Sequence, residues 1–482
     1  MKFIIIRHAE SNGNKEHIIQ GTNDIYTITQ NGINECLAML KKNNKQLELV
    51  DKVYCSKLIR AKQTCEIIAS SIHFKGEIIY TSLLNEMNPG VISGMQRDKV
   101  KIKYPNYYNL WMARKDLDGI PGAETGEELQ VRCLAFLQNF IEDTETNNTY
   151  LVVTHAGYMR CLINICNGNE RIRPVNVGNL SLHVIENPWN NIKHRCLKRD
   201  KRSSVYIIEL HNKKYILKRY RRLITSWDIE ISHIENKVAA VKKNIPKVYW
   251  IGKNKGMFKI MEYMKGNPII EMSYITLQDI KIIIKELYEI NSLYNEFNEE
   301  LPKNKHTLYE KILRYMNNCK DKTLYNIGIL LLENKLIMDL LMSEQKLCLY
   351  DMHNLNVLHN MKEFCFIDLD SVVYAPKDYQ IASFLSAFCL LNNVCDKEYE
   401  LREILLYSQK FGYCPSNIIS LLIIRAYTGI IYFSSDFNDN NKEYIEKYKK
   451  LIYKSCMLLE ENKNILGRDI LNIIENDWRD IY

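Results

Sequence analysis

The sequence predicts an α/β fold for the first part of the chain. Three apolar runs, at residues 2–6, 53–56 and 150–154, are short and rich in β-branched or aromatic side chains, as in buried parallel strands. A stripe of small and apolar residues at helical spacing follows the second run, at Ala61, Cys65, Ile68 and Ile72. Strands that alternate with helices in this way are typical of an open, mostly parallel sheet.

Cationic residues follow the predicted strands where each strand ends. Arg7 and His8 follow the first run, and His155 follows the third. Arg60 lies on the first turn of the helix after the second run. The carboxyl ends of parallel strands meet at one edge of the sheet, where ligands bind. We therefore expect these four side chains to form a cup for one phosphoryl group, because arginine binds phosphate oxygens and an uncharged imidazole can attack phosphorus. The cations should also lower the pKa of His8 and keep its ring unprotonated.

An acid for the leaving oxygen is found in the loop Leu83–Gly90. This loop contains Glu86 and is punctuated by Gly90 and, further on, Gly94. A free glutamate has a pKa of about 4.3, so Glu86 would need burial or a neighbouring anion to hold its proton near neutral pH. A bound phosphate is a candidate for that anion.

The composition is that of an ordinary globular protein. The chain has 482 residues, of which 46% are hydrophobic and 25% charged, and it is long enough for two or three domains. The net charge of +8 is spread over short runs, so no nucleic-acid-binding module is indicated. Fourteen scattered cysteines, with no Cys-x-x-Cys pair and no signal peptide, favour reduced thiols and a cytoplasmic location. The apolar stretch 418–433 contains Arg425 and is expected to be too short for a membrane span, so a core helix and no membrane partner are predicted.

Further elements complete the first part of the chain. The aromatic stretch Tyr104–Trp111 is expected either to roof the phosphate pocket and select the substrate or simply to pack in the core. Residues 127–142 read as a helix and residues 179–185 as the closing strand. The segment Asn187–Asn191 breaks the pattern, so the first domain is predicted to span residues 1–188.

In order and spacing, residues 1–188 resemble the histidine phosphatase superfamily, also called phosphoglycerate mutase-like. The matching residues are Arg7-His8-Ala9-Glu10, Asn14, Gln20-Gly21-Thr22, Thr29, Gly32, Ser56, Arg60-Ala61, Gln63-Thr64, Glu86, Gly90, Gly94, Pro121-Gly122, Glu124 and Thr154-His155-Ala156-Gly157. The resemblance implies a three-layer α/β/α fold and a phosphoric monoester hydrolase that needs no cofactor. The alternative, in which the cations are only polar strand ends, explains any one of them but not the ordered set.

The same resemblance implies residue roles. His8 would be the phosphorylated nucleophile, with Arg7, Arg60 and His155 as the phosphate pocket and Glu86 as the proton donor. The implied substrate contacts are Asn14, Gln20, Gly21, Thr22 and Gly157. Met87 stands where the mutases carry an arginine that holds the substrate carboxylate, which favours the phosphatase branch.

A different pattern begins after residue 198. Two β-rich runs, 204–210 and 215–220, form a predicted hairpin whose second strand contains Lys218. A helix at 234–241 is expected to set Glu235 against Lys218, although Glu230 lies close by. Residues 260–266 resemble a strand that runs into a hinge, and the chain from Leu277 onward is mostly helical.

One interruption of the helical part contains several carboxylates and amides. Asp351 and Asn356 lie five positions apart in a loop, and Asp368 ends the second arm of a short hairpin. Oxygen ligands of this kind suit magnesium shared with substrate phosphates. The alternative is that Asp351 and Asp368 only cap and pair within the hairpin.

Residues 198–482 are similar to the aminoglycoside phosphotransferase and choline kinase group. The similarity implies a bilobal, protein-kinase-like α+β domain, with an N-lobe at about 198–264 and a C-lobe at about 268–482. It implies the following site residues: Lys218, Glu235, Ser203, Ser204 and Glu262 for the nucleotide, Asp351 as the base, Asn356 and Asp368 for Mg²⁺, and Asp370 and Asp378 in more structural roles. ATP or GTP and Mg²⁺ would be the cofactors. Two features depart from the group: Leu349-Tyr350 stand in place of His-Gly, and the loop 199–204 lacks glycine.

Together these patterns predict a bifunctional cytoplasmic enzyme. A phosphatase acting on a small phosphorylated metabolite would be fused to a kinase for a small-molecule hydroxyl acceptor. A second hypothesis makes the kinase-like part a silent nucleotide- or ligand-binding module that regulates an active phosphatase. A third makes the phosphatase part a phosphohistidine relay or a protein phosphatase.

Overall fold

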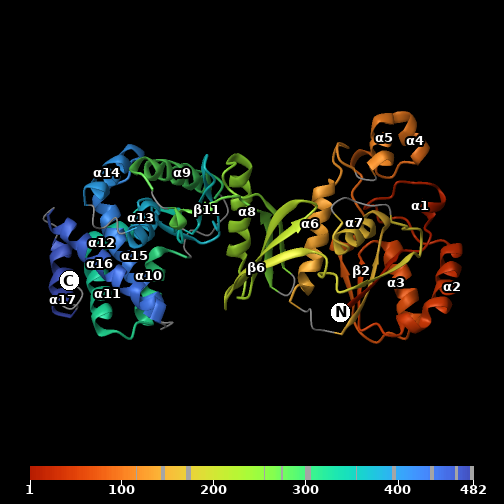
Figure 1. Ribbon diagram of the computed structural model, residues 1–482, viewed down its shortest axis with the longest axis horizontal. Helices are drawn as coiled ribbons and strands as arrows, with labels where there is room; N and C mark the ends of the chain where they lie inside the picture. Colours follow the sequence, from red (N-terminus) through yellow and green to blue (C-terminus); the bar gives the residue numbers. More distant parts are fainter. Residues whose placement is uncertain are drawn as a thin grey trace. The chain divides into compact units, whose positions relative to one another are not determined.

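The computed structural model of the chain comprises two compact units (Figure 1). Unit 1 contains Met1–Ile224 and Tyr249–Tyr263, and unit 2 contains Thr225–Val248 and Met264–Tyr482. The residues described are 1–114, 117–142, 147–169, 175–253, 256–272, 275–298, 306–353, 355–392, 398–434, 439–461 and 465–477.

The core of unit 1 is a five-stranded sheet in the order β3-β2-β4-β1-β5. Its strands are β1 Lys2–Arg7, β2 Lys52–Ser56, β3 Ile78–Thr81, β4 Thr149–Thr154 and β5 Leu182–Glu186. The first four are parallel, and β5 runs antiparallel to β1 at one edge. This arrangement confirms the parallel strands expected from the three apolar runs.

Helices cover both faces of this sheet, because successive residues of a strand point to opposite sides. Phe3 and Ile5 of β1 pack in one cluster with residues of α6 and α7, while Ile4 and Ile6 pack in another with residues of α2 and α3. The helices and short turns of this part are α1 Asn12–Lys15, α2 Gln30–Leu47, α3 Ile59–Ser71, η1 Ser82–Leu84, η2 Gly90–Ile92, α4 Arg97–Lys103, α5 Pro105–Arg114, α6 Gly126–Leu137, η3 Gln138–Phe140 and α7 Ala156–Cys166. The predicted three layers are therefore present, and the helix expected at 127–142 ends at Leu137 and continues as a 3₁₀ turn.

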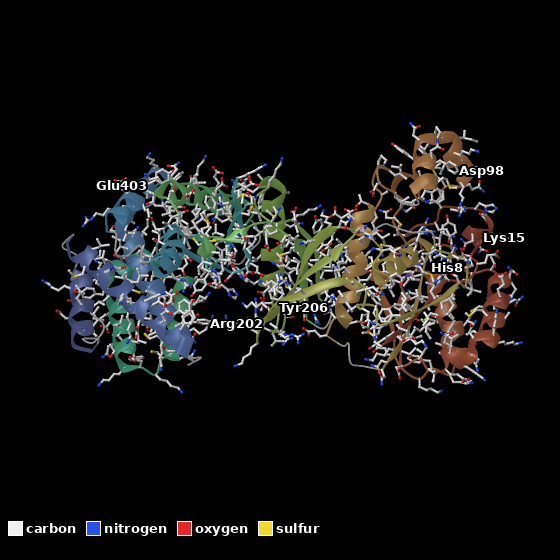
Figure 2. The ribbon with its side chains drawn as sticks, in the orientation of Figure 1. His8, Lys15, Asp98, Arg202, Tyr206 and Glu403 are labelled. Carbon is white, nitrogen blue, oxygen red and sulfur yellow. The ribbon has the colours of Figure 1, made fainter. Side chains whose placement is uncertain are left out.

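A second sheet completes unit 1, in the order β6-β7-β8-β10-β9. Its strands are β6 Lys193–Arg199, β7 Ser203–Leu210, β8 Lys213–Tyr220, β9 Val248–Lys253 and β10 Met257–Glu262. The hairpin expected around Lys218 is β7 and β8, with Tyr206 on β7 (Figure 2). One face of the sheet, including Ile208, Leu217 and Ile260, shares a cluster with α6 and α7. Most of the predicted N-lobe therefore packs on the α/β/α layers of unit 1. The domain boundaries at residues 188 and 198 stay a prediction.

Unit 2 is mostly helical around one large apolar cluster. Its elements are α8 Ser226–Val241, β11 Asn267–Pro268, η4 Ile269–Glu271, α9 Leu277–Glu296, α10 Leu308–Asn317, α11 Lys322–Glu333, α12 Lys335–Leu341, β12 Gln345–Leu349, β13 Val357–His359, β14 Phe364–Phe366, β15 Val372–Pro376, α13 Tyr379–Asn392, α14 Glu398–Ser408, η6 Gln409–Phe411, α15 Pro415–Ser434, α16 Asp439–Glu461 and α17 Ile465–Asp477. Strands β13 and β14 form the short hairpin expected between Asn356 and Asp368.

Helix α15 is the apolar stretch that was expected to be too short for a membrane span. That expectation about length is wrong, since the helix has 20 residues and a mean hydropathy of 1.4 over its best window. Of that window, however, 72% is buried inside unit 2, as in a core helix. Within the described residues it is the one helix with the length and composition of a span.

Candidate active site

Two histidines lie side by side at the carboxyl edge of the first sheet of unit 1. Strands β1 and β4 are parallel neighbours, and Arg7 pairs with Thr154 in their register. His8 and His155 are therefore the next residues on adjacent strands, and their ring centroids lie 5.0 Å apart. Both side chains are buried. The edge predicted to carry the site thus brings them together.

The ring of His8 is held in one tautomer. Its Nδ1 lies 2.7 Å from the carbonyl oxygen of Ala9, which can only accept a hydrogen bond, so Nδ1 carries the proton and Nε2 has the lone pair. Burial lowers the pKa of His8 well below its usual value, and the charges of Arg60 and Arg7 lower it further. The predicted neutral ring is confirmed, but burial rather than the cations is its largest cause.

Arg7 and Arg60 are held by backbone carbonyl groups rather than by carboxylates. Arg7 Nη1 donates to Val177 O at 2.7 Å, and Arg60 donates to Asn23 O at 2.9 Å and Gly21 O at 2.7 Å. The Nε atoms of both arginines are buried and have no hydrogen-bond partner among the described residues. Burial lowers the pKa of Arg60 to about 10, so the guanidinium is still protonated at neutral pH. Each arginine is oriented by the protein and keeps a donor for a ligand.

His155 is placed in the same way. Its Nε2 lies 2.7 Å from the hydroxyl of Ser56, and its Nδ1 is buried without a partner among the described residues. Burial is the largest cause that lowers the pKa of His155, followed by the charge of Arg60. Three buried nitrogen atoms, Arg7 Nε, Arg60 Nε and His155 Nδ1, therefore surround His8 without protein partners.

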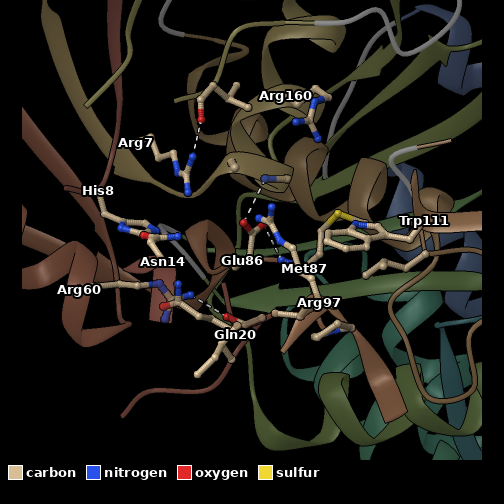
Figure 3. A pocket seen from close by; sticks show the side chains of 18 of the residues that line it. Arg7, His8, Asn14, Gln20, Arg60, Glu86, Met87, Arg97, Trp111 and Arg160 are labelled. Carbon is tan, nitrogen blue, oxygen red and sulfur yellow. Dashed lines mark hydrogen bonds between the residues drawn. The ribbon is translucent and has the colours of Figure 1, made fainter. Parts of the chain in front are cut away.

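Glu86 faces this group from the loop after β3 (Figure 3). Its carboxylate accepts hydrogen bonds from the backbone N–H groups of Met87 at 2.9 Å and of Gly157 and Tyr158 at 3.1 Å each. A Cβ atom on Gly157 would lie 2.6 Å from Glu86 Oε1, so only glycine allows this approach. The first turn of α7 thus fixes the predicted acid beside the histidines.

Arg132, which the sequence did not single out, positions the loop that carries Glu86. Its guanidinium makes two bonds of 2.7 Å to the carboxylate of Glu124 and donates to the carbonyl oxygens of Leu83 and Asn85 at 2.9 and 2.7 Å. Arg132 is one of few charged residues in the apolar segment of α6, a pattern that indicates a buried partner. Asn179 was also missed; its Nδ2 donates to the His8 carbonyl oxygen at 3.0 Å.

Most predicted substrate contacts lie at the cavity. Asn14, Gln20, Gly21 and Gly157 line it, whereas Thr22 is exposed and is not among the lining residues. The Oδ1 of Asn14 accepts from Ser11 and Asn179, and Gln20 Oε1 accepts from Ser11, so their amide nitrogens face the cavity side of the network. Gly21 has a φ of +52°, and a Cβ there would lie 2.1 Å from Pro89. Only glycine can therefore give Arg60 its carbonyl partner here.

The cavity has a volume of about 300 Å³. The aromatic stretch Tyr104–Trp111 was expected either to roof this cavity or to pack in the core, and its residues do both. Trp111 lines the cavity, while Tyr104, Tyr107 and Tyr108 pack against the core cluster. Met87 also lines the cavity, together with two arginines that the sequence had not indicated, Arg97 and Arg160.

The residues predicted for a kinase site lie in both units. In unit 2, Asn356 Nδ2 donates to the backbone oxygen of Asp351 at 2.9 Å, and Asn356 O accepts from Ile367 N at 2.9 Å. These bonds bring the loop after β12 next to the segment that carries Asp368, whose φ is +59°. The Asp351 carboxylate lies 3.4 Å from Arg425 of α15. Asp378 accepts from Cys414 N and Asn417 Nδ2, which agrees with a structural role.

The remaining predicted nucleotide contacts lie on the second sheet of unit 1 and on α8. Lys218 lies on β8 and Glu262 ends β10, whereas Glu235 is buried on α8 in unit 2. Ser203 and Ser204 are buried, and the hydroxyl of Ser204 donates to Glu142 at 3.1 Å. Glu142 also binds Arg199, Arg219 and Arg221. The pairing of Lys218 with Glu235 stays a prediction.

The donor chemistry at Asn356 and Asp368 is compatible with magnesium, which takes oxygen ligands. Asn356 Nδ2 is used by Asp351, which leaves the amide oxygen for a cation. Among the described residues, no group of three or more histidine, cysteine, aspartate or glutamate side chains is arranged to hold a metal ion. A magnesium ion here would therefore depend on these two residues and on the oxygens of its nucleotide.

Comparison with known proteins gives one family. A model described as histidine phosphatase superfamily (branch 1) matches residues 3–195. Phosphoglycerate mutase-like protein 4 of Arabidopsis thaliana is 30% identical over 174 residues, which are 36% of this chain and 71% of that protein. A 2,3-bisphosphoglycerate-dependent phosphoglycerate mutase of Azorhizobium caulinodans is 26% identical over 36% of this chain and 82% of its own length. Phosphoserine phosphatase 1 of Hydrogenobacter thermophilus is 28% identical over 34% and 74%, respectively.

Proposed function

The chain belongs to the histidine phosphatase superfamily, and from that membership we propose that it hydrolyses a small phosphorylated metabolite through a phosphohistidine at His8. The observation that carries this proposal is the set of three buried, unpartnered nitrogen atoms around His8, at Arg7, Arg60 and His155. Two of the three, Arg7 Nε and Arg60 Nε, are donors, and buried donors without partners cost stability, so they favour a ligand that supplies acceptors. His155 donates from Nε2 to the Ser56 hydroxyl, which itself donates to Asn85, so Nδ1 becomes a donor only when the ring is protonated beside a bound anion. The oxygens of a phosphoryl group supply the acceptors.

The first step transfers the phosphoryl group to the protein. The lone pair on His8 Nε2 forms a bond to phosphorus as the bond between phosphorus and the ester oxygen breaks. Arg7 and Arg60 bind the phosphoryl oxygens and stabilise the charge that develops on them. Protonated Glu86 gives its proton to the leaving oxygen, which departs as an alcohol.

The second step releases phosphate. The Glu86 carboxylate takes a proton from a water molecule, whose oxygen forms a bond to phosphorus as the bond from phosphorus to Nε2 breaks. Inorganic phosphate leaves, and His8 and Glu86 return to their starting states. The Ala9 carbonyl keeps the proton on Nδ1 throughout, so Nε2 is the atom that reacts.

We favour net hydrolysis over a mutase reaction because of Met87. This apolar, buried residue stands beside Glu86 in the cavity wall, at the position where the resemblance to the mutases implies an arginine. A mutase must hold its substrate while the phosphoryl group is returned to it. Without that arginine, the alcohol is free to leave before water attacks.

The test is phosphate release from a panel of small phosphate esters by the full chain and by the variant His8→Asn. We expect His8→Asn to reduce turnover by about 10⁴-fold or more, since it removes the nucleophile. The wild-type protein, quenched during turnover, should carry an acid-labile phosphoryl group that this variant lacks. His73→Asn is the matched control, because His73 is exposed and has a φ of +52°, a conformation that asparagine tolerates. Hydrolysis that persists in His8→Asn would exclude the mechanism.

A second activity, phosphoryl transfer from a nucleotide to a small-molecule hydroxyl group, is proposed for the kinase-like residues. It is supported by the hydrogen bonds that join Asp351, Asn356 and Ile367 in unit 2. Asp351 would orient the acceptor hydroxyl, and Asn356 and Asp368 would hold magnesium, which neutralises phosphate charge when bound. Contacts of the nucleotide with Lys218, Glu235, Ser203, Ser204 and Glu262 are part of the same proposal.

The ion pair between Asp351 and Arg425 supports the competing proposal, a silent nucleotide- or ligand-binding module. An arginine on the base competes with the acceptor hydroxyl for the same carboxylate oxygen. Transfer from ATP or GTP with Mg²⁺ to a panel of alcohols, lost in Asp351→Asn, would establish the kinase. Nucleotide binding measured by calorimetry, without transfer to any alcohol, would establish the module.

A cytoplasmic location also stays a proposal. It is supported by the cysteines, since the twelve whose side chains the structure describes are free thiols. Localisation of a tagged full-length chain in cell fractions tests it.

A further inference from the structure

Two arginines line the cavity beyond those that hold the predicted phosphoryl group. Arg97 begins α4, and Arg160 lies on α7, one turn after Gly157 (Figure 3). Neither forms an ion pair with a carboxylate in the described part of the chain. The guanidinium of Arg97 lies 5.6 Å from the ring centroid of Trp111, a contact that orients the side chain without neutralising it. The charges of both arginines are thus not neutralised by carboxylates of the described residues.

The charges that line the cavity do not balance. Its lining includes four guanidinium groups, at Arg7, Arg60, Arg97 and Arg160, and one carboxylate, at Glu86. His8 is neutral, so the net charge is +3 with Glu86 ionised and +4 with Glu86 protonated, as the first step requires. A phosphomonoester carries a charge of about −2 at neutral pH. At least one positive charge therefore remains after the phosphoryl group has bound.

The arginines are also close enough to act on each other. Burial is the largest cause that lowers the pKa of Arg7; the Glu86 charge raises it, and the charges of Arg97 and Arg160 lower it further. Like charges collected around one hollow destabilise the unliganded protein unless a ligand neutralises them. Arg97 is exposed and Arg160 half-buried, so both can reach a group that extends from the phosphoryl position toward Trp111.

We propose that the substrate is a phosphomonoester with a second anionic group, which Arg97 and Arg160 bind. This inference rests on the proposed phosphatase function and names the substrate class for the same site. A cavity of about 300 Å³ lies at the lower end of the range for small-molecule sites, so the substrate is a small metabolite. Carboxylates and phosphates both accept the planar fork of arginine, and the experiment separates them.

Arg97 and Arg160 orient the bound ester for the first step, whereas retention of the alcohol product, which a mutase needs, is not assigned to them. Arg160 projects from the same helix, α7, whose first turn holds Glu86. Binding the second anion therefore fixes the leaving alcohol relative to the acid. Trp111 and Met87 supply the apolar wall between the two charged ends of the substrate.

The test compares matched esters with the full chain. O-phosphoserine against phosphoethanolamine and 3-phosphoglycerate against glycerol 3-phosphate each differ in a carboxylate. The bisphosphate of 1,3-propanediol against propyl phosphate differs in a second phosphate. We expect kcat/KM to favour the ester with two anionic groups by about tenfold or more in at least one pair, and the pair that responds identifies the second anion.

The variants Arg97→Met and Arg160→Met should each reduce that preference roughly 10- to 100-fold, mainly through KM. Turnover of the ester with one anionic group should fall less than turnover of the ester with two, because the loss of cavity charge affects both esters and the loss of direct contact affects only the second anion. Lys99→Met is the matched control, since Lys99 is an exposed cation on α4 outside the cavity lining and should keep the wild-type preference. Thermal melting of each variant shows whether it is folded.

Two results overturn the inference. In the first, neither member of any pair is preferred by the wild-type protein. In the second, the preference survives in the double variant Arg97→Met/Arg160→Met. Both leave the phosphatase intact, because esters are still hydrolysed in a His8-dependent way. Failure of the proposed function looks different: no ester is hydrolysed and no phosphohistidine forms, which removes the inference as well.

Discussion

The cavity around His8 in unit 1 and the loop around Asp351 in unit 2 differ in how their charged groups are paired. In the cavity, arginines are held by backbone carbonyl groups and keep buried donors without partners. In the loop, the carboxylate of Asp351 is 49% exposed and already faces Arg425 at 3.4 Å. Arg425 Nε is also buried without a partner among the described residues, but the charge of Arg425 is already paired with a carboxylate. Arg7 and Arg60 have buried donors and no ion pair with a carboxylate in the described residues, so they give the stronger reason to expect an anionic ligand. The difference shows why the phosphatase assignment is the firmer of the two.

The largest effect that tests the difference between the two regions is expected when the acid, Glu86, is removed from the cavity. Glu86→Gln should lower kcat for alkyl phosphates by about 10²- to 10⁴-fold, because the leaving oxygen no longer receives a proton. With p-nitrophenyl phosphate, whose leaving group needs no proton, the loss should be under about tenfold. Steady-state kinetics with both esters measures the contrast. Equal losses would mean that Glu86 binds substrate rather than donating a proton.

The next largest effect is expected on stability, from the ion pair of Arg132 with Glu124 that positions the loop carrying Glu86. Arg132→Met leaves the Glu124 carboxylate without its partner, and breaking a buried pair costs about 3–5 kcal/mol of unfolding free energy. Urea denaturation followed by a signal from unit 1 measures it. The double variant Arg132→Met/Glu124→Leu should recover most of that loss, since no charge is then left buried. Failure to recover would show that the bonds from Arg132 to Leu83 O and Asn85 O matter more than the ion pair.

The pH dependence of the unfolding free energy tests whether the two histidines of the cavity are buried and neutral. Burial lowers the pKa of both His8 and His155 in the folded protein, so between the folded and unfolded values the unfolded chain binds more protons. The unfolding free energy should therefore fall as the pH drops below about 6.5, by up to roughly 1.4 kcal/mol per pH unit for each histidine. Denaturation curves from pH 8 to 5 test this. His8→Asn should reduce the slope, and an unchanged slope would contradict the burial argument.

The smallest effect is expected in unit 2. Asp351→Asn removes the charge from a pair in which the Asp351 side chain is 49% exposed and the Arg425 side chain 12% exposed. Solvent reaches one partner, and the amide oxygen can still accept from Arg425, so stability should change by about 1 kcal/mol. Phosphatase activity should not change. Thermal melting and ester hydrolysis measure both. A larger loss of stability would show that the Asp351 loop is a structural element rather than a candidate site.

The residues that follow strands could be predicted from the sequence, whereas those on helix faces could not. His8 and His155 come directly after predicted strands, and Arg60 lies on the first turn of the helix after β2, so their place at the sheet edge follows from strand direction. Glu86 was expected from its glycine-punctuated loop and the family resemblance, since β3 was not predicted. Arg97, Arg132 and Arg160 project from helices, and where a helical side chain points depends on how the helix packs. Arg160 could have been noticed in the sequence, because it is the one charged residue in the uncharged and mostly apolar segment that forms α7.

The second sheet shows a similar limit. Strands β7 and β8 alternate apolar and polar residues and were predicted as a hairpin. Strand β6 was not predicted, since every residue in it is exposed and it is held at the sheet edge by backbone hydrogen bonds to β7. Side-chain pattern predicts a strand only where one face is buried.

The packing of the second sheet on α6 and α7 has a practical consequence for isolating the phosphatase half. Tyr206, Ile208, Tyr215 and Phe258 cover apolar side chains of these two helices, and the ring nitrogen of Trp189 donates to Leu137 O at 3.1 Å. A polypeptide cut at residue 188 would uncover that layer, and the exposed apolar surface would drive aggregation. Protein producers who want a well-behaved excised enzyme should keep the strands through about residue 263.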